Sequence, residues 1–224
     1  MSEYLTSVVD IKNISKGNFI MRLNKKDLHF NAGQFFSIGL KNLGINREYS
    51  VASSPKETYI DFFIREIEDG SISSKLRKLK TGDEVKILGP FGEFYLNSYD
   101  KTKKYIFIAT GTGLAPFLSL INHHKIKNYE IHHGIRYLDD IFNLFELNNY
   151  NVYVSREEKK ILASYESKNI DIFKGRMNNY LNEIKTSENN LFFLCGNSRM
   201  VSEVYDVLVS KEVSQKNIFT EIFF

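Results

Sequence analysis

Glycine and threonine alternate directly after an apolar run in the middle of the chain. The run Y-I-F-I-A (105–109) continues as T-G-T-G-L-A-P (110–116). Glycines let the backbone approach a ligand closely, and the unpaired N–H groups at the start of a following helix bind anions. Because the spacing is not G-x-G-x-x-G, the segment fits either a phosphate-binding loop or a purely structural tight turn.

Arginines follow the later apolar runs. Arg156 comes after N-V-Y-V-S (151–155), and Arg176 comes after Gly175. A guanidinium is planar and matches the oxygens of a phosphate, and Ser155 adds a hydroxyl donor. Two or three charge-assisted hydrogen bonds of roughly 1.5–3 kcal/mol each would favour a 2′-phosphorylated dinucleotide by a few hundredfold or more. A solvated pair of surface arginines is the alternative.

A single cysteine, Cys195, ends the run L-F-F-L-C (191–195) and precedes G-N-S-R-M (196–200). It fits a small buried side chain or a reactive thiol at the end of a strand. One cysteine forms no internal disulfide and cannot by itself build a thiolate metal site. We therefore expect a reducing compartment, the cytoplasm.

The segment R-E-Y-S-V-A-S-S-P (47–55) offers a different set of groups. On a strand, Arg47 and Tyr49 share a face and Ser50 points the other way. An arginine for a phosphate, an aromatic ring for a flat ligand and a hydroxyl for a ring nitrogen are what a flavin nucleotide needs. An edge strand with a surface arginine and a half-buried tyrosine is the alternative.

Two histidine pairs, His123-His124 and His132-His133, resemble metal ligands by composition. Neighbouring residues on a strand point to opposite faces, and no cysteine lies nearby to complete a site. We expect no metal.

The chain ends in the apolar residues Phe223 and Phe224. Because termini are seldom apolar, we expect this ending to be buried. It could close the core, or it could stack on a flat ring, which adds roughly 0.5–1.5 kcal/mol beyond burial.

The elements that would position these residues change in character near Asp100. Before it, β-branched and aromatic segments separated by Gly, Asn, Asp or Pro predict a β-sandwich or barrel: 19–23, 34–40, 48–53, 58–67 and 84–89.

One helix is predicted within 70–83, where Ile72, Leu76 and Leu79 recur at helical spacing, with Ser71 as the cap and Gly82 as the stop. Its start, with hydroxyls at Ser73 and Ser74, is a second candidate anion site.

After the polar stretch 97–104, strands alternate with helices, which predicts a parallel sheet covered by helices on both faces. The strand-like segments are 105–109, 130–135, 151–155 and 191–195, and the helix-like segments are 114–124, 138–147, 176–184 and 198–210. Ligands bind beyond the carboxyl ends of such strands, where the glycine, arginine and cysteine segments fall.

Length and composition fit this division. The chain has 224 residues, 42% of them apolar, enough for two domains of roughly 100 residues each. A net charge of +3 argues against a nucleic-acid-binding arm. Acidic residues near the start argue against a secretory signal, and glycines and a proline interrupt the longest uncharged run, so no membrane span is expected.

Taken in order along nearly the whole chain, these segments resemble the ferredoxin (or flavodoxin)–NADP reductase family of the bacterial type. The segments that carry the resemblance are R-E-Y-S (47–50), G-x-x-S-x-x-L (70–76), G-T-G-L-A-P (111–116), G-I-R (134–136), S-R-E (155–157), G-R (175–176), C-G-N-S-R-M (195–200) and the final E-I-F-F.

The resemblance implies a six-stranded antiparallel FAD-binding barrel over residues 1–100, followed by a five-stranded parallel NADP-binding α/β domain over residues 101–224. It implies a monomeric FAD oxidoreductase that exchanges electrons between NADPH and ferredoxin or flavodoxin. A flavin or small-molecule reductase on the same fold, and a non-enzymatic docking subunit, are the alternatives.

The resemblance also implies the roles of individual residues. Ser50, Cys195, Glu221 and Phe223 would position the reacting rings. FAD would contact Arg47, Glu48, Tyr49, Ser50, Ile64, Ile72, Ser73, Ser74, Thr112, Phe223 and Phe224. NADP would contact Gly111, Gly113, Ile135, Arg136, Ser155, Arg156, Arg176, Gly196, Asn197 and Met200.

The chain departs from the family pattern at Ser198, where a proline is usual after C-G-N, and we expect this difference to loosen the turn without abolishing it. The two terminal aromatics resemble the bacterial type, with Phe223 assigned to the flavin ring and Phe224 to the adenine of FAD.

Overall fold

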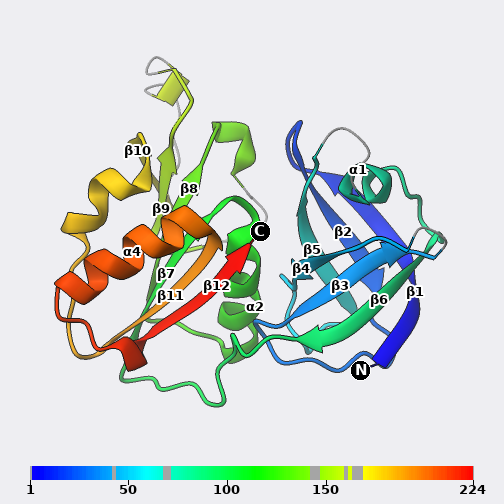
Figure 1. Ribbon diagram of the computed structural model, residues 1–224, viewed down its shortest axis with the longest axis horizontal. Coiled ribbons are helices and arrows are strands. Elements are labelled where there is room, and N and C mark those ends of the chain that lie inside the picture. Colours follow the sequence, from blue (N-terminus) through cyan, green and yellow to red (C-terminus); the bar gives the residue numbers. More distant parts are fainter. Residues whose placement is uncertain are drawn as a thin grey trace. The chain divides into compact units, whose positions relative to one another are not determined.

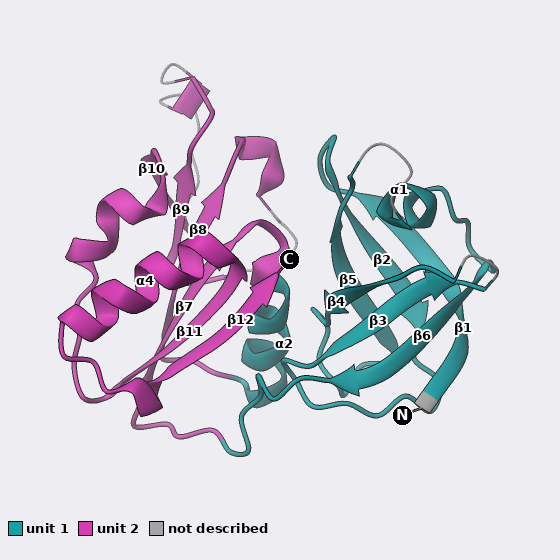
Figure 2. Ribbon diagram, viewed as in Figure 1, with its two compact units in different colours: residues 1–98, 115–125 teal, residues 99–114, 126–224 magenta. Residues whose placement is uncertain are grey.

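A computed structural model describes residues 2–41, 44–67, 72–141, 147–158, 161–162 and 169–223 (Figure 1). The chain divides into two compact units, which Figure 2 distinguishes by colour. Unit 1 comprises Met1–Ser98 and Ala115–Lys125, and unit 2 comprises Tyr99–Leu114 and Ile126–Phe224.

Unit 1 is built on a six-stranded antiparallel sheet in the order β4-β3-β6-β1-β2-β5. Its strands are β1 (Ser2–Asn13), β2 (Asn18–Asn24), β3 (Phe35–Leu40), β4 (Asn46–Ser50), β5 (Tyr59–Arg65) and β6 (Glu84–Phe91). An antiparallel bridge between Val51 and Phe62 joins the end of β4 to β5, so the two outer strands meet. The predicted six-stranded antiparallel barrel is therefore confirmed.

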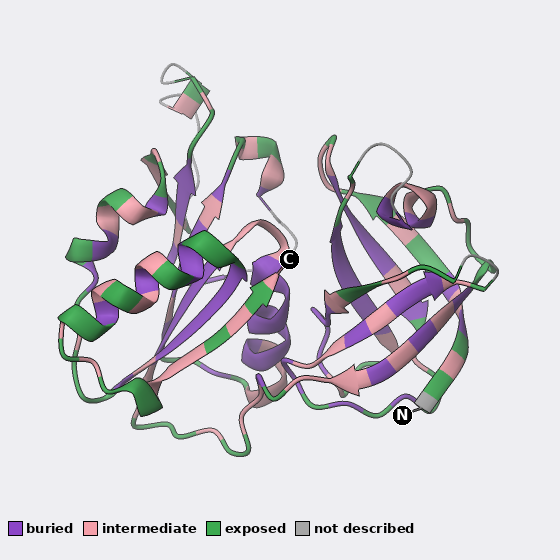
Figure 3. Cartoon of the chain, in the orientation of Figure 1, coloured by how far each residue is buried: buried purple, intermediate pink, exposed green. Residues whose placement is uncertain are grey.

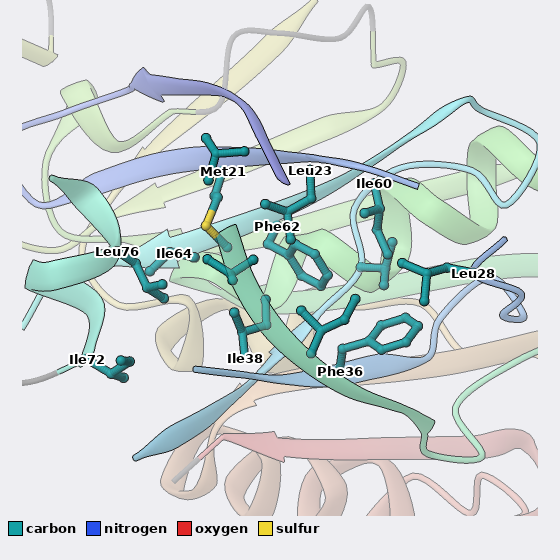
Figure 4. Close-up of a cluster of buried hydrophobic side chains, with 14 of the residues drawn as sticks. Met21, Leu23, Leu28, Phe36, Ile38, Ile60, Phe62, Ile64, Ile72 and Leu76 are labelled. Carbon is teal, nitrogen blue, oxygen red and sulfur yellow. The ribbon is translucent and has the colours of Figure 1, made fainter. Parts of the chain in front are cut away.

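The interior of this barrel is aromatic and aliphatic (Figure 4). Phe36 packs edge-on against both Phe30 and Phe62, the preferred geometry of aromatic pairs. The short helix α1 (Ile72–Arg77) adds Ile72 and Leu76 to the same cluster, as the helical spacing predicted. The predicted cap of this helix at residue 71 lies outside the described residues, and the predicted stop at Gly82 is wrong, because α1 ends at Arg77 before Leu79.

Unit 2 contains a parallel sheet in the order β10-β9-β8-β7-β11-β12. Its strands are β7 (Lys104–Thr110), β8 (Tyr129–Ile135), β9 (Tyr150–Val154), β10 (Ile170–Lys174), β11 (Asn190–Asn197) and β12 (Ile218–Phe223). The parallel α/β class is confirmed, but the predicted count of five strands is wrong. The C-terminal segment adds a sixth strand, β12, because it pairs in parallel with the open edge of β11.

The helices agree only partly with the helical patterns. The helices α2 (Ala115–His124) and α4 (Ser198–Ser210) form where they were predicted, and Val201, Val204 and Leu208 of α4 are buried. The predicted helix 176–184 is a 3-10 helix, η3 (Met177–Glu183). Of the predicted helix 138–147, the structure describes residues 138–141 and 147, and it contains the 3-10 helix η2 (Leu138–Asp140).

Figure 3 shows how far each residue is buried. The central strands β7 and β11 are buried along nearly their whole length, as expected for a parallel sheet covered on both faces. Among the described residues, no helix has the length and apolar character needed to cross a bilayer.

One ion-pair cluster on β8 makes the stability of unit 2 depend on pH. The Glu130 carboxylate lies 2.9 Å from Nε2 of His132 and 2.6 Å from Nζ of Lys104. These two partners lower the pKa of Glu130 from 4.5 to about 2. The ionised carboxylate therefore contributes stability that is present above pH 4.5 and is lost as the pH falls through 2.

We expect Glu130→Gln to lower the free energy of unfolding by about 1–2 kcal/mol at pH 7, a value discounted for partial exposure. The difference from the unsubstituted protein should shrink as the pH falls from 4.5 towards 2, as measured by urea unfolding. Glu84→Gln, in the exposed pair of Lys41 and Glu84, is the control and should change little. If the loss of unfolding free energy in Glu130→Gln did not vary with pH, this account of Glu130 would be contradicted.

Candidate functional site: glycine turns and arginines at the strand ends of unit 2, and β4 in unit 1

The turn after β7 needs glycine at two positions for different reasons. The 3-10 helix η1 (Gly111–Leu114) follows β7 and leads into α2. Gly111 has φ +54°, and among the described residues other than its chain neighbours no atom lies within 4 Å of where its Cβ would be, so the space on that side is open. A Cβ on Gly113 would lie 2.3 Å from the carbonyl oxygen of Cys195, so no side chain fits there.

The ends of β7 and β11 are locked together by a second close approach. Gly196 has φ +138°, and a Cβ there would lie 2.3 Å from Oγ1 of Thr110. The same Oγ1 accepts a hydrogen bond of 3.0 Å from the N–H of Asn197. The Asn197 side chain then accepts from the N–H of Arg199 and caps α4. The glycine segments 111–113 and 196–197 therefore lie side by side.

Three arginines follow three neighbouring strands. Arg136, Arg156 and Arg176 come directly after or close behind the ends of β8, β9 and β10, and all three are exposed. The N–H of Arg156 donates to the carbonyl of Arg136 at 2.9 Å, which fixes these two strand ends relative to each other.

Ser155 strengthens the same edge, because both its N–H and its hydroxyl donate to the carbonyl of Ile135. Among the residues that the structure describes, no carboxylate forms a salt bridge with any of the three arginines. Arg199, by contrast, pairs with Glu203 at 2.7 Å. The strand ends therefore present three guanidiniums that form no salt bridge with a carboxylate of the described residues.

Cys195 and Glu221 form a pair across β11 and β12. The two residues are in register, and the thiol Sγ lies 3.7 Å from Oε1 of Glu221. Burial, with the Glu221 charge beside it, raises the pKa of the Cys195 thiol well above its ordinary value. The cysteine is thus a buried protonated thiol, not a reactive thiolate. Phe223 is half-buried and in register with Asn197, and Phe224 lies outside the described residues.

In unit 1, the side chains of β4 become more buried from Arg47 to Ser50. Arg47 and Glu48 are exposed, Tyr49 is half-buried and Ser50 is buried. Burial raises the pKa of Tyr49 to about 12, although the Arg47 charge opposes this shift. Nη1 of Arg47 donates to the carbonyl of Asn46 at 3.0 Å. Arginine and tyrosine side chains thus lie close together on β4, as the alternation predicted.

The other unit 1 residues predicted to contact FAD lie in or beside the barrel core. The side chains of Ile64 and Ile72 are in the barrel core. The Ser73 hydroxyl accepts from the N–H of Ile67 at 2.9 Å, and Ser74 is half-buried. Residue 70, the proposed start of this anion site, lies outside the described residues.

One residue of unit 2 was not considered for the dinucleotide site in the sequence analysis. His133 and His132 do face opposite sides of β8, as predicted, but His133 reaches the glycine turn: its Nε2 lies 2.8 Å from the carbonyl oxygen of Gly111. Its position three residues before Arg136, in H-G-I-R, is the signal that could have indicated this. No cluster of three or more potential metal ligands occurs in the described parts of the chain.

Comparisons with known proteins agree with this arrangement. A family model described as the oxidoreductase FAD-binding domain matches residues 6–95, and one described as the oxidoreductase NAD-binding domain matches residues 107–206. The flavodoxin/ferredoxin–NADP reductase of Buchnera aphidicola subsp. Baizongia pistaciae is 28% identical over 97% of this chain and 95% of its own length. The chain belongs to the ferredoxin/flavodoxin–NADP reductase family.

Other members extend the comparison. The flavodoxin/ferredoxin–NADP reductase of Escherichia coli K12 is 32% identical over 63% of this chain and 60% of its own length. A crystal structure of a ferredoxin NADP+ reductase from Neisseria gonorrhoeae with bound FAD and NADP is 20% identical and covers 100% of both chains with a TM-score of 0.84. At this identity, the second comparison establishes a shared fold.

The chemistry of the two sets of donors fits the cofactors of this family. A guanidinium, a phenol ring and a hydroxyl on β4 offer a flavin nucleotide a phosphate partner, a flat surface and a hydrogen bond. The three arginines and the open backbone at Gly111 offer a dinucleotide several phosphate partners and room for close approach.

We expect Gly113→Ala to lower the free energy of unfolding by roughly 1–3 kcal/mol, because the added methyl meets backbone atoms of Cys195 and Gly196 that cannot move aside independently. Chemical denaturation checks this value. Gly17→Ala is the matched control, since nothing lies within 4 Å of its Cβ position, and it should stay within about 0.5 kcal/mol. Equal stability of the two variants would show that the backbone of β11 at Cys195 and Gly196 can shift to make room for the added methyl group.

Proposed function

We propose that this chain is an FAD-dependent oxidoreductase that transfers electrons between NADPH and a one-electron carrier, ferredoxin or flavodoxin. The FAD-binding and NAD-binding family models, in that order along the chain, support the two cofactors. The Buchnera aphidicola reductase of this name, which matches over 95% of its own length, supports the reaction. The proposal includes a functional division at residue 100, a monomeric state and a cytoplasmic location.

The observation that carries the preference for NADPH is the set of three arginines at adjacent strand ends. A 2′-phosphate adds about two negative charges to the dinucleotide, and charge-assisted hydrogen bonds to guanidinium groups favour it over a ribose hydroxyl. Because no described carboxylate pairs with Arg136, Arg156 or Arg176, these groups need not break an existing ion pair to bind a phosphate.

The protein groups in this reaction orient the reactants and need not form covalent bonds to them. FAD, when bound, accepts a hydride and releases electrons singly. Ser50 would donate a hydrogen bond to the flavin ring, and Arg47 would bind its pyrophosphate. Cys195 and Glu221 would line the nicotinamide pocket, where a protonated thiol adds no charge beside the ring.

We expect Arg156→Ala to lower the ratio of kcat/KM for NADPH to that for NADH by roughly 10- to 100-fold, the effect of one charge-assisted hydrogen bond. Steady-state kinetics with ferricyanide as acceptor measures this ratio. Lys216→Ala, on the exposed 3-10 helix η4 (Gln215–Asn217), removes the same charge elsewhere in unit 2 and is the control. An unchanged ratio in Arg156→Ala would contradict the proposal that the arginines at these strand ends bind the 2′-phosphate.

The purified protein should be yellow, with the visible spectrum of bound FAD, and anaerobic NADPH should bleach it. A colourless protein that cannot be reconstituted with FAD would contradict the proposed function. Comparing turnover with flavodoxin, ferredoxin and free riboflavin then identifies the acceptor, because a reductase for small molecules would favour riboflavin.

A further inference from the structure

The buried residue His133 connects two strands of unit 2 to the glycine turn. It lies on β8, fully buried, with its ring stacked near that of Tyr150 of β9. Its Nδ1 lies 2.7 Å from the Tyr150 hydroxyl, and its Nε2 lies 2.8 Å from the carbonyl oxygen of Gly111. A hydrogen-bonded chain therefore runs from β9 through β8 to η1.

The partners of His133 determine where its proton sits. A carbonyl oxygen can only accept, so Nε2 must carry the proton and donate it to Gly111. Burial lowers the pKa of His133 to about 4, against opposing contributions from the Gly111 carbonyl and the Asp140 carboxylate, so the ring is neutral near pH 7. In a neutral ring with Nε2 protonated, Nδ1 has a free lone pair, and the Tyr150 hydroxyl donates to it.

This contact fixes the orientation of one peptide group in the turn. In a planar trans peptide the carbonyl and the following N–H point in opposite directions. Holding the Gly111 carbonyl towards His133 therefore aims the N–H of Thr112 away from the sheet interior. Gly111 has little intrinsic preference among backbone conformations, and no side chain packs over its Cβ position, so the turn depends on such an external contact.

We propose that His133 is a positioning residue for dinucleotide binding: as the Nε2-protonated tautomer that the Gly111 carbonyl requires, and supported at Nδ1 by Tyr150, it holds the Gly111–Thr112 peptide so that the Thr112 N–H faces the ligand. This inference rests on the proposed function, since it assumes that the turn binds the pyridine dinucleotide. It adds to that function a buried residue that does not itself contact the ligand.

Three variants test the proposal. His133→Leu removes both hydrogen-bonding groups from a side chain of related size, and His133→Gln retains a donor and an acceptor. Tyr150→Phe removes only the hydroxyl that donates to Nδ1. Each is measured for KM and kcat with NADPH and ferricyanide, for FAD content, and for the affinity of 2′,5′-ADP, which has the 2′-phosphate but lacks the nicotinamide half.

We expect His133→Leu to raise KM for NADPH roughly 3- to 10-fold, the effect of one neutral hydrogen bond, while the affinity for 2′,5′-ADP and the FAD content change less than about twofold. His133→Gln should recover most of the loss, and Tyr150→Phe should show a smaller increase. In the unsubstituted protein, nitrogen-15 NMR should show His133 protonated at Nε2 and not at Nδ1.

Several results would overturn the proposal. These are equal KM values in His133→Leu and the unsubstituted enzyme, a parallel loss of 2′,5′-ADP affinity, and a His133 ring protonated at Nδ1. The NMR result decides the tautomer even if His133→Leu fails to fold. An unsubstituted protein that does not oxidise NADPH would instead contradict the proposed function, so the two failures are distinguishable.

Discussion

The close approach of the β7 turn to the end of β11 is the constraint on which the rest of unit 2 depends. A side chain at Gly113 would overlap the Cys195 carbonyl, and one at Gly196 would overlap Thr110. The contact at Gly113 is with backbone atoms, so no rotamer change can relieve it, and a Cβ at Gly196 would also lie 3.0 Å from the backbone N and O of Thr110. These two contacts fix the start of η1, the cap of α4 and the register of the Cys195–Glu221 pair against one another.

In unit 2, some cations form salt bridges with carboxylates, whereas the arginines at the strand ends do not do so among the described residues. Carboxylates neutralise the cations that support the sheet, as Glu130 does for Lys104, and Glu203 pairs with Arg199 of α4. The arginines at the strand ends have no such partners among the described residues. An ion pair that must be broken before a ligand binds subtracts from the affinity. Among the described residues, the distribution of carboxylates therefore leaves these three guanidiniums without an ion pair to break.

Much of the fold follows from local patterns. Runs such as 19–23 and 105–109 are dense in β-branched and aromatic residues, and the apolar stripe of α4 has a clear helical period, so these elements were predictable. The strands β1 and β10 were not named, because β1 exposes Leu5 and Val9 and β10 has no buried residue, so neither shows a strong apolar pattern. The sixth strand, β12, depends on pairing with β11, a contact between distant segments.

Some residues of the candidate site were also predictable from the sequence, and others were not. Glycine and arginine residues were recognised because their chemistry is tied to their type and their place after strands. The proposed role of His133 was not predicted from the sequence, because its partners Gly111 and Tyr150 lie far from it along the chain. Spacing alone indicated only that the two histidines of β8 face opposite sides, which argued against a shared metal but could not reveal their separate partners.

The helix α2 follows η1 directly in the chain, yet it groups with unit 1. There the Ser119 hydroxyl donates to the carbonyl of Ser53, and Phe117 packs against Phe94. A gene fragment ending at the polar stretch near Asp100 would thus encode the six strands of the barrel but omit a helix that covers part of them. Dissecting this protein into separately expressed halves would require carrying residues 115–125 with the first half, for instance by circular permutation or complementation between fragments.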